Sequence, residues 1–359
     1  MVMIMDKYER TCNLLTMHCQ KYPRLQIQDI LKYLYQSSFG CEHLVTDLSS
    51  AVDYISNESK GVDLNSDNLI DSLDGEYSRV HLSFLNRGLS AETLGKIFLK
   101  SAKKEPAGVS ELEEKIQVAI KLMQENKLPF SPTEFEAATQ EWRNGGFSAV
   151  HHSDEFRANY NPAYRVISNT YIPFLPLFAR VDKILKEKNA VVAIEGGSAS
   201  GKTTLSKMFE ELYDCTVFHM DDFFLRPEQR TPQRYAQIGG NIDRERFLEE
   251  VLMPLKENKS VCYRKFDCST MTLSTGVKIV PKRLTVIEGV YSMHPAFSGY
   301  YDCSAFLDIS PQLQKKRIEK RNGPQLAKRF FDEWIPLEEI YFEKLQIKKH
   351  SNILISILE

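Results

Sequence analysis

The segment GGSASGKT at residues 196–203 is the feature that most constrains what this chain can fold into. It fits the pattern G-x-x-x-x-G-K-[ST], and it lies between an apolar run, AVVAIEG at 190–196, and TLSKMF at 204–209, which continues as a helix would. Glycines let backbone N–H groups turn inward around phosphate oxygens at a helix N-terminus, whose dipole favours anions. We therefore expect a strand, a phosphate-binding loop and a helix in this order; a glycine-rich turn without a ligand is the alternative.

The region from about residue 186 onward reads as an α/β domain. Short apolar runs at 190–196, 215–220, 284–290 and 304–310 alternate with helical segments. Apolar strands of this kind, each followed by a loop and a helix, indicate a parallel sheet covered on both faces. We expect a domain over 186–359 built as a P-loop parallel sheet with flanking helices, with the boundary near the polar stretch LKEKNA at 185–190.

The first part of the chain, residues 1–185, reads instead as a mostly α-helical domain. Apolar residues recur at helical spacing over 23–40, 90–104, 110–126 and 131–144. Only YSRVHLSFL at 77–85 has some strand character. A chain of 359 residues suits two domains of this size.

Composition excludes several classes of function. The 46 basic and 48 acidic residues give a formal net charge of −2, so neither nucleic acid nor an anionic membrane is an expected partner. The seven cysteines form no C-x-x-C pair, which indicates free thiols rather than a zinc site or a disulfide framework. The most apolar segment, YIPFLPLFA at 171–179, is too short to cross a bilayer and contains two prolines. We expect a soluble, cytoplasmic protein.

Chemical roles can be predicted for the loop and for the strand that follows it. Lys202 would reach the β and γ phosphates of a nucleotide, and Thr203 would hold Mg²⁺. Asp221 and Asp222 follow the run at 215–220, where side chains face the cleft of an open parallel sheet. A carboxylate there could accept the proton of an attacking hydroxyl, although such a pair elsewhere is more often a helix cap or turn. The predicted nucleotide-binding residues are Gly196, Gly197, Ser198, Ala199, Ser200, Gly201, Lys202, Thr203 and Thr204.

Residues 191 to about 345 resemble a family of nucleoside and small-metabolite kinases. This family is grouped around uridine kinase and phosphoribulokinase and includes nicotinamide riboside kinase. The resemblance lies in EGGSASGKTT at 195–204, MDDFF at 220–224, NIDRERFLEEVLMPLKENKSV at 241–261, LTVIEGVYSM at 284–293 and FLDISPQLQKKRIEKRNG at 306–323. A weaker match is RFFDEWIPLEEIYF at 329–342. The first 185 residues resemble no family that we recognise.

The resemblance implies roles for individual residues. MDDFF is similar to a D-x-[YF]-[YF] segment whose first aspartate is the catalytic base, which selects Asp221 over Asp222. Asp243 would bind acceptor hydroxyls, and Glu288 would lie near both Mg²⁺ and the acceptor. The implied phosphate-binding arginines, one helical turn apart, are Arg317 and Arg321, with Arg329 as a weaker candidate.

One stretch departs from the family pattern. Uridine kinases carry an aromatic-rich block ending in T-H-x-R that recognises the pyrimidine, and here the corresponding stretch is YRKFDCSTMTLSTG at 263–276. Phe266 and Asp267 are retained, so Phe266 is a candidate for substrate binding, but Met271 or a neighbour stands where the histidine would be. A site that loses a hydrogen-bonding group discriminates poorly, which puts uridine itself in doubt. Asn322 also follows Arg321 where the family often has aspartate.

Two segments of the first domain are dense in polar and aromatic residues. His43 beside Glu42, and His151 and His152 near Asp154, could form a metal or phosphate site if the segments meet; structural or solvent-facing histidines are the alternative. A second group could bind a nucleotide or an acceptor, or could simply belong to a polar helix packed on its neighbours. Its members are Arg157, Tyr160, Tyr164 and Arg165.

Two functions fit this sequence. The first is an ATP-dependent kinase that moves the γ-phosphoryl group of Mg-ATP to a hydroxyl of a small metabolite such as a nucleoside, a riboside or a similar alcohol. The second is a regulator in which nucleotide binding controls what the helical domain binds. A base, an acceptor-binding aspartate and arginines favour the kinase, because a switch needs no acceptor site. The acceptor, the choice between ATP and GTP, homo-oligomerisation and a linked reaction in the helical domain stay open.

Overall fold

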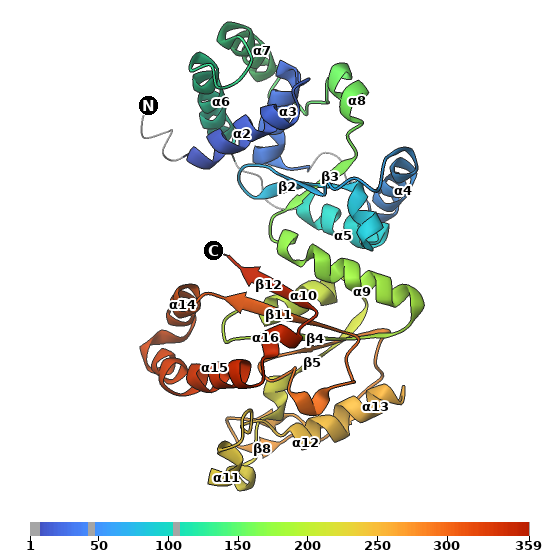
Figure 1. The fold of residues 1–359 in the computed structure, drawn as a ribbon, viewed down its shortest axis with the longest axis vertical. Coiled ribbons are helices and arrows are strands. Elements are labelled where there is room, and N and C mark those ends of the chain that lie inside the picture. The colour runs from blue at the N-terminus through green and yellow to red at the C-terminus, as the bar shows by residue number, and fades with distance from the viewer. Residues whose placement is uncertain (1–7, 42–46, 103–107, 359) are drawn as a thin grey trace. The chain divides into compact units, whose positions relative to one another are not determined.

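The computed structural model describes residues 8–41, 47–102 and 108–358 (Figure 1). The chain divides into two compact units, residues 1–175 and 176–359. The division falls at the start of helix α9 (Leu175–Glu187), so this helix belongs to the second unit.

Unit 2 is built on a five-stranded parallel sheet with the order β12-β11-β4-β10-β5. Four of its strands follow the apolar runs read from the sequence, and the predicted α/β fold is confirmed. The central strands are almost wholly buried, as expected for a sheet covered on both faces. The strands are β4 (Ala190–Gly196), β5 (Cys215–His219), β10 (Leu284–Glu288), β11 (Cys303–Ile309) and β12 (Ile353–Ile357).

Helices lie on both faces of this sheet. Helix α10 (Lys202–Leu212) follows the glycine-rich loop and packs against β4, β5 and β10. A separate apolar cluster joins Phe218, Ile287 and Phe306 of the strands to Phe247 and Tyr341 of other helices. The further helices of unit 2 are α11 (Pro232–Tyr235), α12 (Arg244–Phe247), α13 (Met253–Lys256), α14 (Pro311–Arg329), α15 (Ile335–Lys344) and α16 (Ile347–His350).

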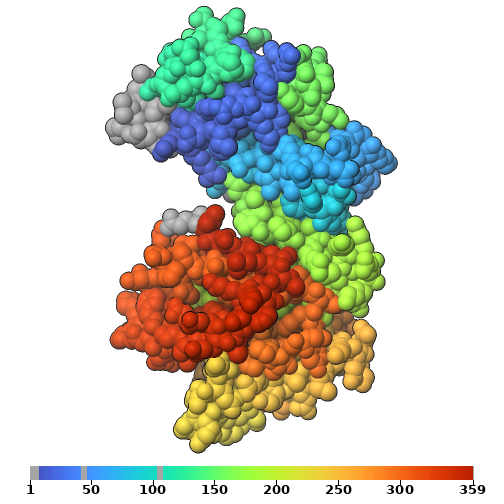
Figure 2. All heavy atoms as spheres, in the orientation of Figure 1, coloured from blue at the N-terminus to red at the C-terminus, as the bar shows by residue number. Residues whose placement is uncertain are grey.

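The region between β5 and β10 carries short antiparallel strand pairs in addition to helices. β6 (Val261–Tyr263) pairs with β9 (Val277–Ile279), and β7 (Phe266–Asp267) pairs with β8 (Thr272–Leu273). Figure 2 shows in yellow that the segment containing α11 projects from the body of unit 2. The stretch that departs from the uridine kinase pattern therefore forms its own small β structure.

Unit 1 is mostly helical, as predicted, but it also contains a three-stranded antiparallel sheet in the order β1-β2-β3. Its strands are β1 (Ile70–Ser72), β2 (Tyr77–His81) and β3 (Tyr164–Ser168). Its helices are α2 (Glu9–Lys21), α3 (Ile27–Phe39), α4 (Leu48–Glu58), α5 (Ala91–Ala102), α6 (Val109–Gln124), α7 (Pro132–Asn144) and α8 (Asp154–Tyr160). Within the described ranges, no helix combines the length and the apolar character needed to cross a membrane.

Candidate active site

The glycine-rich loop at 196–203 connects β4 to α10 as the sequence predicts. Gly196 has a φ of 147°, and a Cβ atom added to it would lie 2.6 Å from the carbonyl oxygen of Leu307 on the neighbouring strand. Gly201 has a φ of 102° and caps the N-terminus of α10. Both positions require glycine, because L side chains rarely adopt these conformations and the first position has no room for one.

Lys202 is the first residue of α10, and its side chain folds back over the loop. Its Nζ donates hydrogen bonds to the carbonyl oxygens of Gly196 at 2.7 Å and Gly197 at 2.9 Å. The ammonium group therefore lies at the centre of the turn, with only 8% of the residue exposed. This is where a cation would meet the phosphates of a nucleotide, so the prediction for Lys202 is compatible with the geometry.

Residues from α14 and α15 hold the outer side of the loop. Gln314 donates to the carbonyl oxygen of Ser198 at 2.9 Å, and Arg317 Nη1 donates to that of Ala199 at 3.3 Å. Glu338 accepts from the backbone N–H of Ser198 at 2.8 Å and from its hydroxyl. Burial raises the pKa of Glu338, while Lys202 and the Ser198 donors act in the opposite direction. No local pattern singles out Gln314 or Glu338, because each lies more than a hundred residues from the loop in sequence.

Asp221 follows β5 in a short 3₁₀ segment, Met220–Phe223. Asp221 is exposed to solvent, and among the described residues it makes no hydrogen bond or ion pair. Burial raises the pKa of Asp221, and the charges of Glu288 and Asp222 raise it further, whereas Lys202 and His219 lower it. A carboxylate that is accessible, uncommitted and more basic than usual can accept a proton.

Asp222 lies in a different environment. One of its carboxylate oxygens is 3.1 Å from Lys265 Nζ and accepts a hydrogen bond of 3.3 Å from the hydroxyl of Tyr263. The neighbouring aspartate is therefore engaged with the short β segment, while Asp221 is not. The geometry is compatible with Asp221 as the base, and this assignment stays a prediction.

Glu288 ends β10 beside the glycine-rich loop. It is directly opposite His219 on the neighbouring parallel strand, and His219 Nδ1 lies 2.6 Å from Glu288 Oε1. This contact raises the pKa of His219. Thr203 Oγ1 donates to the same oxygen of Glu288 at 3.5 Å. The hydroxyl and the carboxylate oxygens are the hard donors that Mg²⁺ prefers, so Thr203 and Glu288 fit the predicted metal site.

The predicted acceptor-binding residues lie in more enclosed surroundings. Asp243 is 2% exposed, and it accepts hydrogen bonds from the backbone N–H of Arg246 at 3.2 Å and from its Nε at 3.1 Å. Phe266 is also buried, and the guanidinium carbon of Arg230 lies 5.6 Å from its ring centre. A structural role as half of a buried ion pair is thus evident for Asp243, and acceptor binding by Asp243 and Phe266 stays a prediction.

The three predicted phosphate-binding arginines differ in their contacts. Arg317 touches the glycine-rich loop, as described above. Arg321, one turn further along α14, donates to the side chain of Asn322 at 2.6 Å and lies over the ring of Phe330. Arg329 pairs with Glu333 at 3.2 Å and is exposed. The helix is interrupted at Gly323, where φ is 68°, so Arg329 lies beyond the break that separates it from the other two.

The histidines of unit 1 do not form a metal centre in the described part of the chain, which contains no cluster of three potential ligands. His43 and Glu42 lie outside the described residues. His151 is exposed, whereas His152 is buried, with Nδ1 2.8 Å from Asp29 and Nε2 2.6 Å from the hydroxyl of Tyr164. For His152 the structure supports the alternative of a hydrogen-bonded structural histidine.

Comparison with known proteins finds sequence similarity over part of the chain. No family model matches the chain. A uridine kinase from Ligilactobacillus salivarius is 26% identical over 144 residues, which cover 38% of this chain and 68% of that protein. A solved structure of a possible uridine kinase from Bacillus stearothermophilus is 21% identical with a TM-score of 0.37, covering 50% of this chain and 98% of its own. A solved structure of a shikimate kinase from Bacteroides thetaiotaomicron is 15% identical with a TM-score of 0.24, covering 46% of this chain and 85% of its own.

The sequence similarity confirms the predicted resemblance to uridine kinase over part of the chain. The parallel sheet, with the glycine-rich loop between its central strand and α10, is a kinase-like P-loop fold. The fold itself accommodates many acceptors, so the substrate has to be argued from the site.

Proposed function

We propose that unit 2 is an ATP-dependent kinase that transfers the γ-phosphoryl group of Mg-ATP to a hydroxyl group of a small metabolite. The acceptor class is a nucleoside, a riboside or a similar alcohol. The observation that carries this proposal is Asp221, an accessible carboxylate with a raised pKa that follows the strand next to β10 and makes no contact that would occupy it. A protein that only switches on nucleotide binding has no need of such a group.

In this mechanism the protein positions the reactants and stabilises charge. The backbone N–H groups of the glycine-rich loop and Lys202 bind the phosphates. Arg317 and Arg321 neutralise charge that develops on the transferring group. Asp221 accepts the proton of the acceptor hydroxyl as its oxygen attacks phosphorus, and ADP leaves.

Thr203 and Glu288 would hold the magnesium ion that accompanies ATP. The ion supplies a positive charge that screens the phosphate oxygens. Glu288 also orients His219 through their 2.6 Å contact, so substitution of Glu288 would disturb both groups. Asp243 would bind acceptor hydroxyls through lone pairs of its carboxylate that do not accept hydrogen bonds from Arg246.

The acceptor is not expected to be uridine. Met271, which stands near the position of the pyrimidine-recognising histidine, has a left-handed backbone conformation with φ of 59° in the turn between β7 and β8. Its sulfur lies 4.0 Å from Arg230 Nη2, so the thioether of this turn and the guanidinium of Arg230 lie where the family pattern would place an imidazole. A different set of hydrogen-bonding groups favours a different acceptor.

The test is a measurement of ATP consumption by the purified full chain with Mg²⁺ across a panel of nucleosides, vitamin ribosides, sugars and amino alcohols. We expect one acceptor class to give turnover that Asp221→Asn and Lys202→Ala abolish. Asp222→Asn is the matched control, because it makes the same change one residue away on a carboxylate engaged with Lys265. ATP binding without phosphorylation of any acceptor would refute the kinase and favour a nucleotide-dependent regulator.

A further inference from the structure

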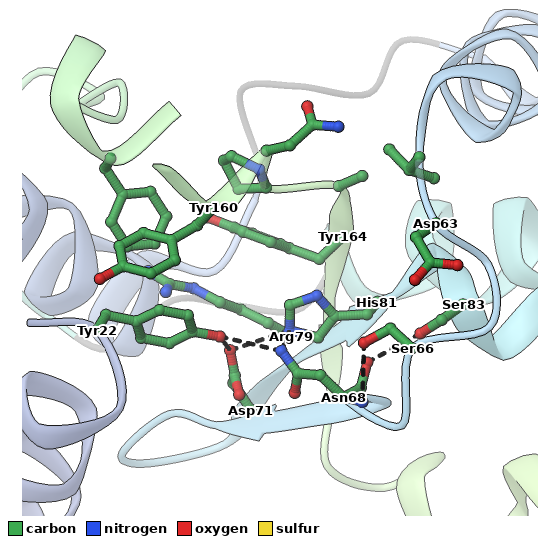
Figure 3. Close-up of a pocket in the computed structure, with 15 residues that line it drawn as sticks. Tyr22, Asp63, Ser66, Asn68, Asp71, Arg79, His81, Ser83, Tyr160 and Tyr164 are labelled. Carbon is green, nitrogen blue, oxygen red and sulfur yellow. Dashed lines mark hydrogen bonds and ion pairs between the residues drawn. The ribbon is translucent and has the colours of Figure 1, made fainter. Parts of the chain in front are cut away.

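Unit 1 contains a polar cavity that the kinase proposal does not use. Its volume is about 310 Å³, within the range of small-molecule sites, and it is lined by residues of all three strands of the antiparallel sheet together with Tyr22 and residues of α8 and its flanking loop. Figure 3 shows the side chains of Asp71, Arg79, His81 and Tyr164 at the sheet and those of Tyr22 and Tyr160 beside them. Tyr160 and Tyr164 belong to the sequence segment that suggested either ligand binding or a packed polar helix.

The register of the sheet brings these side chains together. Asp71 of β1 is directly opposite Arg79 of β2, and His81, two residues further along β2, is opposite Tyr164 of β3. Side chains two residues apart on a strand share one face of a sheet, as do directly opposed residues. One face of the sheet therefore presents an acid, a guanidinium, an imidazole and a phenol to the same cavity.

The negative charge of Asp71 is fully compensated. Its carboxylate accepts hydrogen bonds from the hydroxyl of Tyr22 at 2.7 Å and from His81 Nε2 at 3.0 Å, and it forms an ion pair with Lys21. Burial alone would raise the pKa of Asp71, but these donors lower it well below its usual range. Asp71 is thus not available to neutralise a further cation.

Two charged residues that line this cavity, Arg79 and Asp63, form no ion pair among the described residues, and Arg79 is the buried one. Its residue is 1% exposed, Nε donates to Gln36 at 2.8 Å, and Nη1 lies 3.3 Å from His18 Nε2. Nη2 is buried without a hydrogen-bond partner, and no carboxylate among the described residues forms an ion pair with Arg79. A buried guanidinium without a counterion is costly, and a bound anion would remove this cost.

The groups around Arg79 respond to its charge. Burial lowers the pKa of His18 well below its usual value, and Arg79 lowers it further. Burial likewise lowers the pKa of His152 to about 4 against the opposing effect of Asp29, and Arg79 contributes to the decrease. Both imidazoles are therefore neutral near pH 7, so an anion in the cavity would pair with Arg79 rather than with them.

Aromatic rings form one wall of the cavity. The ring centres of Tyr22 and Tyr160 are 5.0 Å apart, those of Phe156 and Tyr160 are 4.8 Å apart, and the guanidinium carbon of Arg79 lies 4.8 Å from the ring centre of Tyr164. Such distances are typical of favourable aromatic packing. A flat ring can extend this packing, whereas a flexible aliphatic chain gains less from it.

We propose that unit 1 binds a small planar anion in this cavity: a ring compound that carries a carboxylate or a phosphate group, with the anion paired to Arg79 and the ring packed against Tyr22 and Tyr160. A guanidinium can bind either anion through two parallel hydrogen bonds. Ser66 also lines the cavity, and its hydroxyl can contribute a hydrogen bond to a ring substituent. This site does not depend on the function proposed for unit 2.

The test is isothermal titration calorimetry on the full chain carrying Lys202→Ala, so that the phosphate loop of unit 2 does not contribute. The probes are 4-hydroxybenzoate, phenyl phosphate and the neutral 4-hydroxybenzamide. We expect at least one of the two anions to bind at least tenfold more tightly than the benzamide, and whichever binds more tightly identifies the anion. Equal affinity for neutral and anionic probes, or no binding of either anion, would overturn the proposal.

Variants of unit 1 locate the binding. Arg79→Met and Tyr160→Ala should each weaken binding of the tighter anion at least tenfold. Tyr54→Ala is the matched control, because Tyr54 is a tyrosine of unit 1 that is 70% exposed and does not line the cavity. Tyr160 is only half-buried, so its substitution keeps the test valid should Arg79→Met fail to fold. Unchanged affinity in the Tyr160→Ala variant would contradict the site.

Discussion

Replacement of Glu195 by glutamine tests how the sheet supports the glycine-rich loop. Glu195 is fully buried at the end of β4, immediately before the loop. One carboxylate oxygen accepts from the backbone N–H groups of Gly196 at 3.0 Å and Tyr291 at 3.2 Å. The other accepts from the N–H of Met293 and the hydroxyl of Tyr341, both at 3.0 Å. The side chain thus connects the loop to the segment after β10 and to α15.

Two effects compete at Glu195, and burial is the larger. It raises the pKa of Glu195 to about 7, while the hydrogen-bond donors act in the opposite direction. In the unfolded chain a glutamate has a pKa of roughly 4.3. Because the folded pKa is the higher one, the folded state binds the proton more tightly, and stability is lost as pH rises between these two values. At roughly 1.4 kcal/mol per pKa unit, the total loss amounts to about 4 kcal/mol.

Glutamine has the shape of the neutral acid and does not titrate, so the variant lacks this loss. Because an amide nitrogen cannot accept, a backbone N–H group that Glu195 satisfies loses its acceptor in Glu195→Gln, which lowers the stability of the variant by the same amount at every pH. Between pH 4.5 and pH 8 the variant should nevertheless gain about 3 kcal/mol relative to the parent, because most of the parent's loss falls in this interval. The assay is urea unfolding at several pH values in a Trp142→Phe background, where Trp334 of unit 2 is the remaining tryptophan. A variant that loses stability relative to the parent as pH rises would refute the reasoning, because it would show that the four donors outweigh burial.

Three further predictions concern the site. Asp243→Ala should destabilise unit 2 by about 3–5 kcal/mol, because it leaves the buried Arg246 without its carboxylate partner. Urea unfolding of this variant and of Asp222→Ala, which changes a more exposed aspartate, checks the prediction. Equal losses of stability in the two variants would argue against it. Gly196→Ala should cost about 1–3 kcal/mol in thermal or urea unfolding through the clash with the Leu307 carbonyl, and a neutral effect would contradict the backbone geometry. In the pH profile of kcat/KM, the apparent pKa of the acidic limb should lie above the usual range for aspartate, because Asp221 must be deprotonated to act as the base and its pKa is raised. An acidic limb at ordinary aspartate values would oppose its role as base.

The sequence was sufficient where local pattern decides structure. The glycine-rich loop and the four apolar runs around it predict β4, β5, β10 and β11, because β-branched strands and a phosphate loop each have a local signature. β12 was missed although ILISI is apolar, since nothing local indicates that it joins the parallel sheet beside β11. β1 and β3 were missed for a similar reason: they are short and gain their stability from pairing with β2.

The site residues that the sequence missed act across long separations in the chain. Glu338 holds Ser198 from 140 residues away, and Glu195 meets Met293 across 98 residues. The cavity in unit 1 depends on strand register, which places Arg79 and Tyr164 on one face. The sequence alone specifies none of these pairings, since each depends on how distant segments pack.

The most direct test of the central claim is the single-turnover rate of γ-phosphoryl transfer from Mg-ATP to the acceptor found in the panel, compared between the parent and Asp221→Asn at saturating ATP. A general base contributes about 10²–10⁴-fold, so we expect a decrease in this range with ATP affinity nearly unchanged. An undiminished rate in Asp221→Asn would contradict the assignment of Asp221 as the base that makes unit 2 a kinase.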